Sequence, residues 1–185
     1  LNADAIDLQF GGKVMKNVAG FDVSRLLAGS FGTLGLILES SVKVLPKPEM
    51  ERTVFFELDI QSALEKMNAL AGLPIPLSAT CFDGNQLAVR LSGSEIGVTA
   101  AHKKIGGEAS EEVSYWQSVK EQTHPFFEAK GCLYRLSVNP TAPINQDANA
   151  LIEWNGSTRW VWDSGTLGEH QKFASEHGGH VTVFR

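Results

Sequence analysis

Apolar and polar residues alternate over several short stretches of the chain, and a period of two is typical of a β-strand with one buried face. Between these stretches, apolar residues recur three or four positions apart, as in amphipathic helices. The alternating stretches lie at 34–45, 53–60, 77–82, 86–92, 133–138, 150–154, 159–163 and 180–185. The helical spacing lies at 61–71, 94–105, 111–123 and 166–177. This mixture predicts an α+β fold.

The middle of the chain predicts a particular order of elements. Residues 53–110 read as strand, helix, strand, strand, helix, strand, which is the order of a ferredoxin-like half-domain. The sequence Asp-Gly-Asn at 83–85 indicates a hairpin between two of these strands. Strands and helices follow again over 111–185, where 139–149 is expected to be a long loop. We therefore expect two lobes backed by one sheet.

A glycine-rich segment at 12–46 precedes this region. Gly29, Gly32 and Gly35 recur every third residue, with a serine and a threonine between them. Because glycine has no Cβ, such a run can turn sharply and approach a ligand closely. Its free amide groups can then point at an anion such as a diphosphate. The spacing matches neither a P-loop nor a Rossmann fingerprint, and it is also typical of a plain turn between a short helix and a buried strand.

A proline-containing charged stretch divides the chain. The strand pattern after the glycines ends at Pro46, and residues 47–51 are charged and include Pro48, as in a linker. We expect a domain boundary at this point, with one domain at 1–46 and a second at 47–185.

Composition excludes several classes of function. The net charge is −5 and no basic tract occurs, which argues against nucleic-acid binding. The apolar runs are far shorter than a membrane span. The two cysteines, Cys81 and Cys132, indicate a reducing compartment rather than a disulfide framework. The histidines form no metal-binding motif, so no metal site is predicted.

Several strings resemble a known family of flavoproteins. KNVAGFD (16–22) and RLLAGSFGTLGLI (25–37), followed by a strand ending in KVLP (43–46), resemble the last part of the FAD-binding domain in FAD-linked oxidases of the vanillyl-alcohol-oxidase type. The strings LYRLSVNPTAPI (133–144) and GGHVTVFR (178–185) are similar to the FAD-binding E subunit of glycolate oxidase. The resemblance implies the end of an FAD-binding domain followed by a ferredoxin-like cap domain.

The same resemblance implies FAD as cofactor and assigns residues to it. In the family this segment lines the flavin and its diphosphate, largely through backbone groups. The matching positions are Asn17, Gly20, Ser30, Gly32, Thr33, Gly35, Leu36 and Ile37. Serine and threonine hydroxyls can also donate to phosphate or ring oxygens. Asp22 and Arg25 are expected to be structural, as a helix cap and a surface residue.

The predicted cap carries Arg135 inside an apolar strand pattern, which needs an explanation because a buried charge must be paired. It either holds a substrate carboxylate through a bidentate pair or makes an internal ion pair. The cap also offers Arg159, three tryptophans (Trp154, Trp160 and Trp162) and three histidines (His124, His177 and His180). Trp160 and Trp162 are two residues apart on one strand and are expected to share a packed face.

The sequence lacks the cap histidines that serve catalysis and metal binding in the D-2-hydroxyacid dehydrogenases it resembles. The expected function is therefore an FAD-binding subunit that relays electrons from the oxidation of glycolate or a similar 2-hydroxy acid. Its partners would be a catalytic flavoprotein and an iron-sulfur subunit. A structural subunit that docks the catalytic flavoprotein without binding flavin is the alternative, and a ferredoxin-like ligand-binding module with an accidental glycine-rich arm is a third possibility.

Compared with this family, the chain is expected to be a fragment. The pyrophosphate-binding loop would precede it and further residues would follow Arg185, so that these residues alone would be inactive and bind FAD weakly. The expected location is the cytoplasm, or a membrane surface reached through the complex.

Overall fold

The computed structural model describes residues 6–10, 23–110, 114–144, 149–163 and 165–185. The chain divides into two units, Leu1–Lys47 and Pro48–Arg185. The assignment of these units to an FAD-binding segment and a cap domain stays a prediction. Asn17, Gly20 and Asp22, for which roles were predicted, lie outside the described residues.

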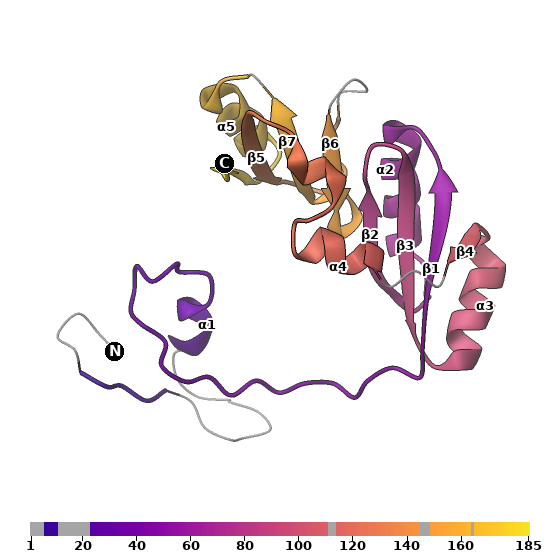
Figure 1. Cartoon of the computed structure of the whole chain (residues 1–185), viewed down its shortest axis with the longest axis horizontal. Coiled ribbons are helices and arrows are strands. Elements are labelled where there is room, and N and C mark those ends of the chain that lie inside the picture. The colour runs from indigo at the N-terminus through magenta and orange to yellow at the C-terminus, as the bar shows by residue number, and fades with distance from the viewer. Residues whose placement is uncertain (1–5, 11–22, 111–113, 145–148, 164) are drawn as a thin grey trace. The chain divides into compact units, whose positions relative to one another are not determined.

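The first unit contains a short helix, α1 (Val23–Leu27), followed by a bend (Figure 1). The strand predicted at 34–45 is wrong: residues 34–49 form neither helix nor strand. A strand needs a neighbour to accept its backbone hydrogen bonds. No strand pairing among the described residues involves this segment, so its apolar side chains, such as Val44 and Leu45, stay exposed.

The second unit begins with the predicted order of elements. These are β1 (Met50–Glu57), α2 (Ile60–Ala71), β2 (Leu77–Phe82), β3 (Gln86–Gly93), α3 (Glu95–Ile105) and β4 (Glu108–Ser110). The strands lie in the order β4-β1-β3-β2, and every neighbouring pair is antiparallel. This is the split β-α-β connectivity.

The remaining elements extend the same sheet. They are α4 (Ser114–Lys120), the 3₁₀ turn η1 (Pro125–Glu128), β5 (Cys132–Ser137), β6 (Ala150–Glu153), the 3₁₀ turn η2 (Trp154–Gly156), β7 (Thr158–Asp163), α5 (Leu167–Glu176) and β8 (His180–Val183). The eight strands run β4-β1-β3-β2-β6-β7-β5-β8. Read from the other edge, β8-β5-β7-β6 copies the order β4-β1-β3-β2, so two rounds of one arrangement share a sheet.

One helix of this arrangement has no counterpart in the second round. The first round places α2 between its first two strands, whereas residues 138–144, the described part of the connection from β5 towards β6, contain no helix. This matches the long loop predicted there. The two rounds meet where β2 pairs with β6, through Cys81↔Glu153 and Phe82↔Ile152.

Capping residues set the helix boundaries. Ser94 caps α3 by accepting a hydrogen bond from the amide of Gly97, and Thr166 and Glu169 form the predicted capping box of α5. At α2 the cap is Asp59, which accepts from the amide of Ser62. Because Asp59 begins the helix, β1 ends at Glu57 instead of continuing to residue 60 as predicted.

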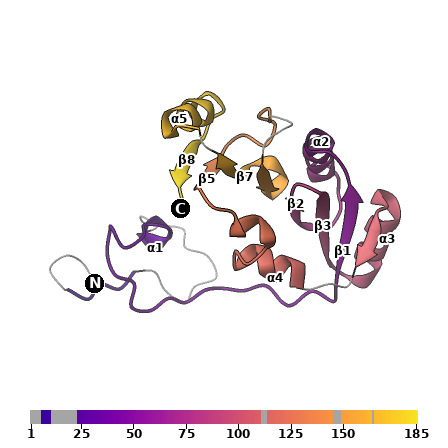
Figure 2. The same ribbon diagram turned by 45° about the horizontal axis from the view of Figure 1, so that its top comes forward.

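Helices cover both faces of the sheet (Figure 2). Along β3, Leu87 and Val89 pack in the cluster that includes α2 and α3, while Ala88 between them packs with Tyr115 of α4. On β5, Leu136 packs against α5. The sheet therefore has one face under α2, α3 and α5 and an opposite face under α4 and η1, which we call the α4 face.

Candidate functional site

Gly32, one of the predicted flavin-binding glycines, lies in a tight turn after α1. The amide of Thr33 donates to the carbonyl of Ser30 at 3.0 Å, and the Thr33 hydroxyl donates to the same oxygen at 2.7 Å. The two central residues, Phe31 and Gly32, have φ values of +50° and +80°. Gly29 before the turn also has a positive φ, of +79°. Left-handed backbone at these two glycines explains why glycine stands there.

This turn leaves backbone donors available. Among the described residues, no backbone hydrogen bond is donated by the amides of Phe31 and Gly32. A Cβ added at Gly32 would meet no atom within 4 Å, and the Phe31 side chain is 96% exposed. Two adjacent amides that donate no bond within the described part of the chain can bind an anionic group such as a phosphate. The turn thus brings Ser30, Gly32 and Thr33 together, while Gly35, Leu36 and Ile37 follow in the irregular segment.

Arg135 lies on the α4 face of β5, opposite Trp160 of β7. Its guanidinium carbon stands 5.6 Å from the centre of the Trp160 ring, within range of a cation–π interaction. Trp160 is buried and Trp162 packs in the same cluster, which confirms that the two share a face. Arg135 itself is half-buried, as the apolar strand pattern indicated.

Glu153 of β6 stands close to this pair. The indole N–H of Trp160 donates to Glu153 Oε2 at 2.7 Å. Burial raises the pKa of Glu153, and the Trp160 hydrogen bond and the Arg135 charge oppose that rise. Among the described residues, no ion pair within 4.0 Å joins Arg135 to a carboxylate.

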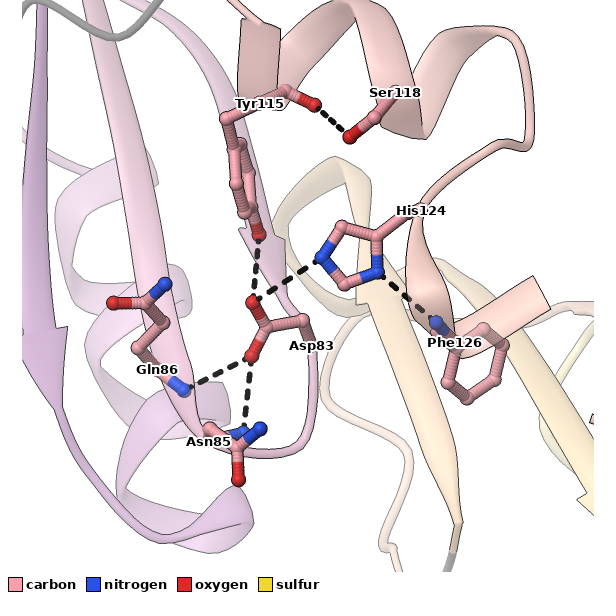
Figure 3. Close-up of polar contacts among 7 residues, drawn as sticks. All are labelled: Asp83, Asn85, Gln86, Tyr115, Ser118, His124 and Phe126. Atoms are coloured by element: carbon pink, nitrogen blue, oxygen red, sulfur yellow. Dashed lines mark hydrogen bonds and ion pairs between the residues drawn. The ribbon is translucent and has the colours of Figure 1, made fainter. Parts of the chain in front are cut away.

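A second polar group joins Asp83, Tyr115 and His124, and the sequence did not single it out (Figure 3). Asp83 Oδ2 accepts a hydrogen bond from the Tyr115 hydroxyl at 3.3 Å and lies 3.6 Å from His124 Nε2. Its Oδ1 accepts from the amides of Asn85 and Gln86 at 3.0 and 3.1 Å. The side chains of Asp83 and His124 are 5% and 15% exposed.

This group is saturated within the protein. His124 Nδ1 accepts from the amide of Phe126, so the proton of a neutral ring lies on Nε2, facing Asp83. Burial raises the pKa of Tyr115 far above its usual value, with smaller contributions from Cys81 and Asp83. With both ring nitrogens and all four groups around Asp83 engaged, the cluster fastens α4 and η1 to the β2–β3 turn. The sequence offered His124 as a cap residue and 83–85 as a hairpin, but it did not indicate that Asp83, Tyr115 and His124 meet.

Arg159, which the sequence offered as a cap residue, has a structural position. It is 2% exposed, and its guanidinium donates to three backbone carbonyls, those of Gly156, Pro143 and Ala142, at 2.9, 2.7 and 2.6 Å. Burial lowers the pKa of Arg159 to about 10. It is therefore committed to the loop after β5 and is not available to a ligand.

The remaining cap residues lie on different elements: Trp154 in η2, His177 at the end of α5 and His180 in β8. Trp154 is 71% exposed in η2, and His177 Nδ1 contacts the carbonyl of Phe173 within α5. In the part of the chain that the structure describes, no three His, Cys, Asp or Glu side chains converge on a metal site. None of the described helices is both long enough and apolar enough to cross a bilayer.

Comparison with known proteins gives two relatives. No protein-family profile matches the chain. It is 41% identical over 180 residues to glycolate oxidase subunit GlcE of Escherichia coli (strain K12), which is 96% of this chain and 51% of that protein. It is 36% identical over 106 residues to glycolate oxidase subunit GlcD of Bacillus subtilis (strain 168), which is 56% of this chain and 22% of that protein. The resemblance to glycolate oxidase subunits is confirmed, and the chain spans about half of GlcE.

Proposed function

We propose that this chain is a glycolate oxidase subunit that helps to hold FAD in a complex that oxidises glycolate or a similar 2-hydroxy acid to the 2-oxo acid. The observation that carries the proposal is the 41% identity to GlcE over 96% of the chain. The finer assignment, to the end of a vanillyl-alcohol-oxidase type FAD-binding domain and its cap, rests on the strings at 16–46 and 133–185.

In this proposal the chain's own residues bind and orient the cofactor. The amides of Phe31 and Gly32 receive one phosphate, and the hydroxyls of Ser30 and Thr33 border it. When bound, FAD supplies a two-electron acceptor for the oxidation. The sheet of the second unit serves as the cap. A catalytic flavoprotein and an iron-sulfur subunit are the proposed partners, in the cytoplasm or at a membrane surface.

The test is the flavin content of the intact protein purified with its partner subunits. Gly32 has a φ of +80°, so replacing it forces a strained backbone into the turn. In a Gly32→Val, Gly35→Val double variant we expect flavin absorbance to fall to less than about a tenth, equivalent to more than about 1.4 kcal/mol of binding free energy. Gly72→Val is the matched control, because Gly72 ends α2 with a negative φ and has room for a Cβ.

Two outcomes contradict the proposal. Unchanged flavin content in the double variant excludes the role of the turn. A colourless intact protein that still co-purifies with its partners supports the alternative, a subunit that docks a catalytic flavoprotein without holding flavin itself.

A further inference from the structure

We propose that Arg135, placed over Trp160 and beside Glu153, binds the carboxylate group of a small 2-hydroxy acid. The choice of a hydroxy acid rests on the proposed function. The existence of an anion site at Arg135 rests on the contacts of the second unit alone.

Arg135 differs from the other arginines of the second unit in having no hydrogen-bond acceptor among the described residues. Arg52 contacts His102 Nδ1 at 3.1 Å, and Arg90 donates to the Ser78 hydroxyl at 3.0 Å. Arg159 and Arg185 both donate to backbone carbonyls. A half-buried guanidinium with unused donors is costly unless something pairs with it.

The groups around Arg135 are held in place. Trp160 forms the surface beneath the guanidinium, and its N–H is fixed on Glu153. Phe127 and Phe184 contact the same indole edge-on, with ring centres 5.5 and 4.9 Å away. A cation held over a rigid aromatic ring loses little further freedom when it binds a ligand, which favours binding.

The chemistry of the two charged residues matches the two ends of a 2-hydroxy acid. A guanidinium presents parallel N–H groups that fit a carboxylate in a bidentate pair. Glu153 uses Oε2 for Trp160, and no hydrogen bond is made to its Oε1 among the described residues. This oxygen can accept a hydrogen bond from the hydroxyl next to the carboxylate. Arg135 would therefore supply affinity for the anion, and Glu153 would supply preference for the hydroxyl.

The site is tested by calorimetric titration of glycolate, and of acetate as a probe without the hydroxyl, into the intact protein after its flavin has been removed. We expect Arg135→Gln to weaken glycolate binding by about tenfold or more, the loss of one charge-assisted pair. Arg135→Lys should retain part of the affinity, because the charge stays while the bidentate geometry is lost. Arg90→Gln is the matched control on the same face and should bind glycolate as the parent protein does.

The Glu153→Gln variant distinguishes a ligand site at Arg135 from a mere charge balance between Arg135 and Glu153. Removing the nearby negative charge should tighten acetate binding and reduce the preference for glycolate over acetate. If Arg135 only balances Glu153, neither acid will bind measurably at millimolar concentration, or Arg135→Gln will bind glycolate as tightly as the parent; either result overturns the proposal. Circular dichroism of each variant checks that the fold is retained. Because the titration uses protein without flavin, its result can be interpreted even if the proposed flavin binding proves wrong.

Discussion

Arg159 is a single residue whose charge is buried without a carboxylate. Its 2% exposure would be prohibitive for an isolated cation, but three backbone carbonyls surround the guanidinium. Those carbonyls belong to η2 and to residues 142 and 143, in the loop that stands where the first round of the fold has a helix. Hydrogen bonds from Arg159 of β7 thus fix the backbone of this loop, as internal hydrogen bonds fix the backbone of a helix.

Replacing this residue should therefore destabilise the protein strongly. In Arg159→Gln the shorter side chain cannot reach all three oxygens, and we expect the free energy of unfolding to fall by about 3 kcal/mol. Urea unfolding followed by circular dichroism measures it. Arg90 is half-buried and contacts the Ser78 hydroxyl and the Trp116 ring, so Arg90→Gln should cost about 1 kcal/mol or less. Equal losses in the two variants would show that the carbonyl contacts contribute little.

At the scale of elements, α4 and η1 are fastened to the sheet by several polar bonds. Trp116 Nε1 donates to the Thr53 hydroxyl and Trp162 Nε1 donates to the carbonyl of Phe126, at 2.8 and 2.7 Å respectively. The Tyr115 hydroxyl adds a bond to Asp83. Because these bonds are shielded from water, ionisation of the phenol beneath α4 should loosen the whole element.

This gives a pH dependence with a definite sign. Burial raises the pKa of Tyr115, so the folded state holds the phenol proton more tightly than the unfolded state does. The associated stability is present below the unfolded pKa of about 10 and is lost as the pH rises above it. We expect Tyr115→Phe to be about 1 kcal/mol less stable than the parent at pH 7 and to lose less stability between pH 9 and 11. Urea unfolding measures the free energy of unfolding of both proteins against pH. Equal losses in the parent and in Tyr115→Phe between pH 9 and 11 would refute this prediction.

The sequence predicted the elements whose signals are local. The capping box at Thr166, the cap at Ser94 and the alternation along β2 and β3 gave the correct element types. The strand at 34–45 failed because alternation shows which face is apolar but not whether a partner strand exists. The end of β1 was misplaced because Asp59, between the apolar residues Leu58 and Ile60, fits the alternation of a strand. In the structure it caps α2 instead.

The candidate site was less predictable because it depends on pairings across the sheet. Arg135 stood out as a charge in an apolar strand, but Trp160 and Glu153 join it only through the register of β5, β7 and β6. Asp83 and His124 are far apart in the sequence, so no local pattern could predict their contact. The turn was predicted because positive φ angles favour glycine, and glycines are visible in the sequence.

At the scale of the whole molecule, the two units differ in how their apolar residues are covered. The second unit encloses its core between helices and sheet, whereas every residue from 36 to 47 is exposed. This exposed segment includes Leu38, Val42 and Leu45. Contiguous exposed apolar residues usually mark a surface that another part of an assembly covers.

Limited proteolysis of the intact protein should therefore cut first within residues 36–47, because exposed backbone without regular hydrogen bonds is cleaved fastest. We expect a resistant product that begins near Met50, identified by mass spectrometry. Saturating FAD together with the partner subunits should slow this cut by about tenfold or more if they cover the segment. A first cut within the second unit would contradict the expected difference between the units.

The doubled strand order has one more consequence. Among the described residues, the β2–β6 strand pairing joins the copies through two residue pairs, and the buried clusters on both sides of the sheet draw residues from each copy. The copies therefore share few backbone pairings, but they share these buried clusters. Separating the copies would expose to water the apolar residues that these clusters bury, so we expect that neither copy folds alone. We therefore expect the second unit to unfold in one cooperative transition.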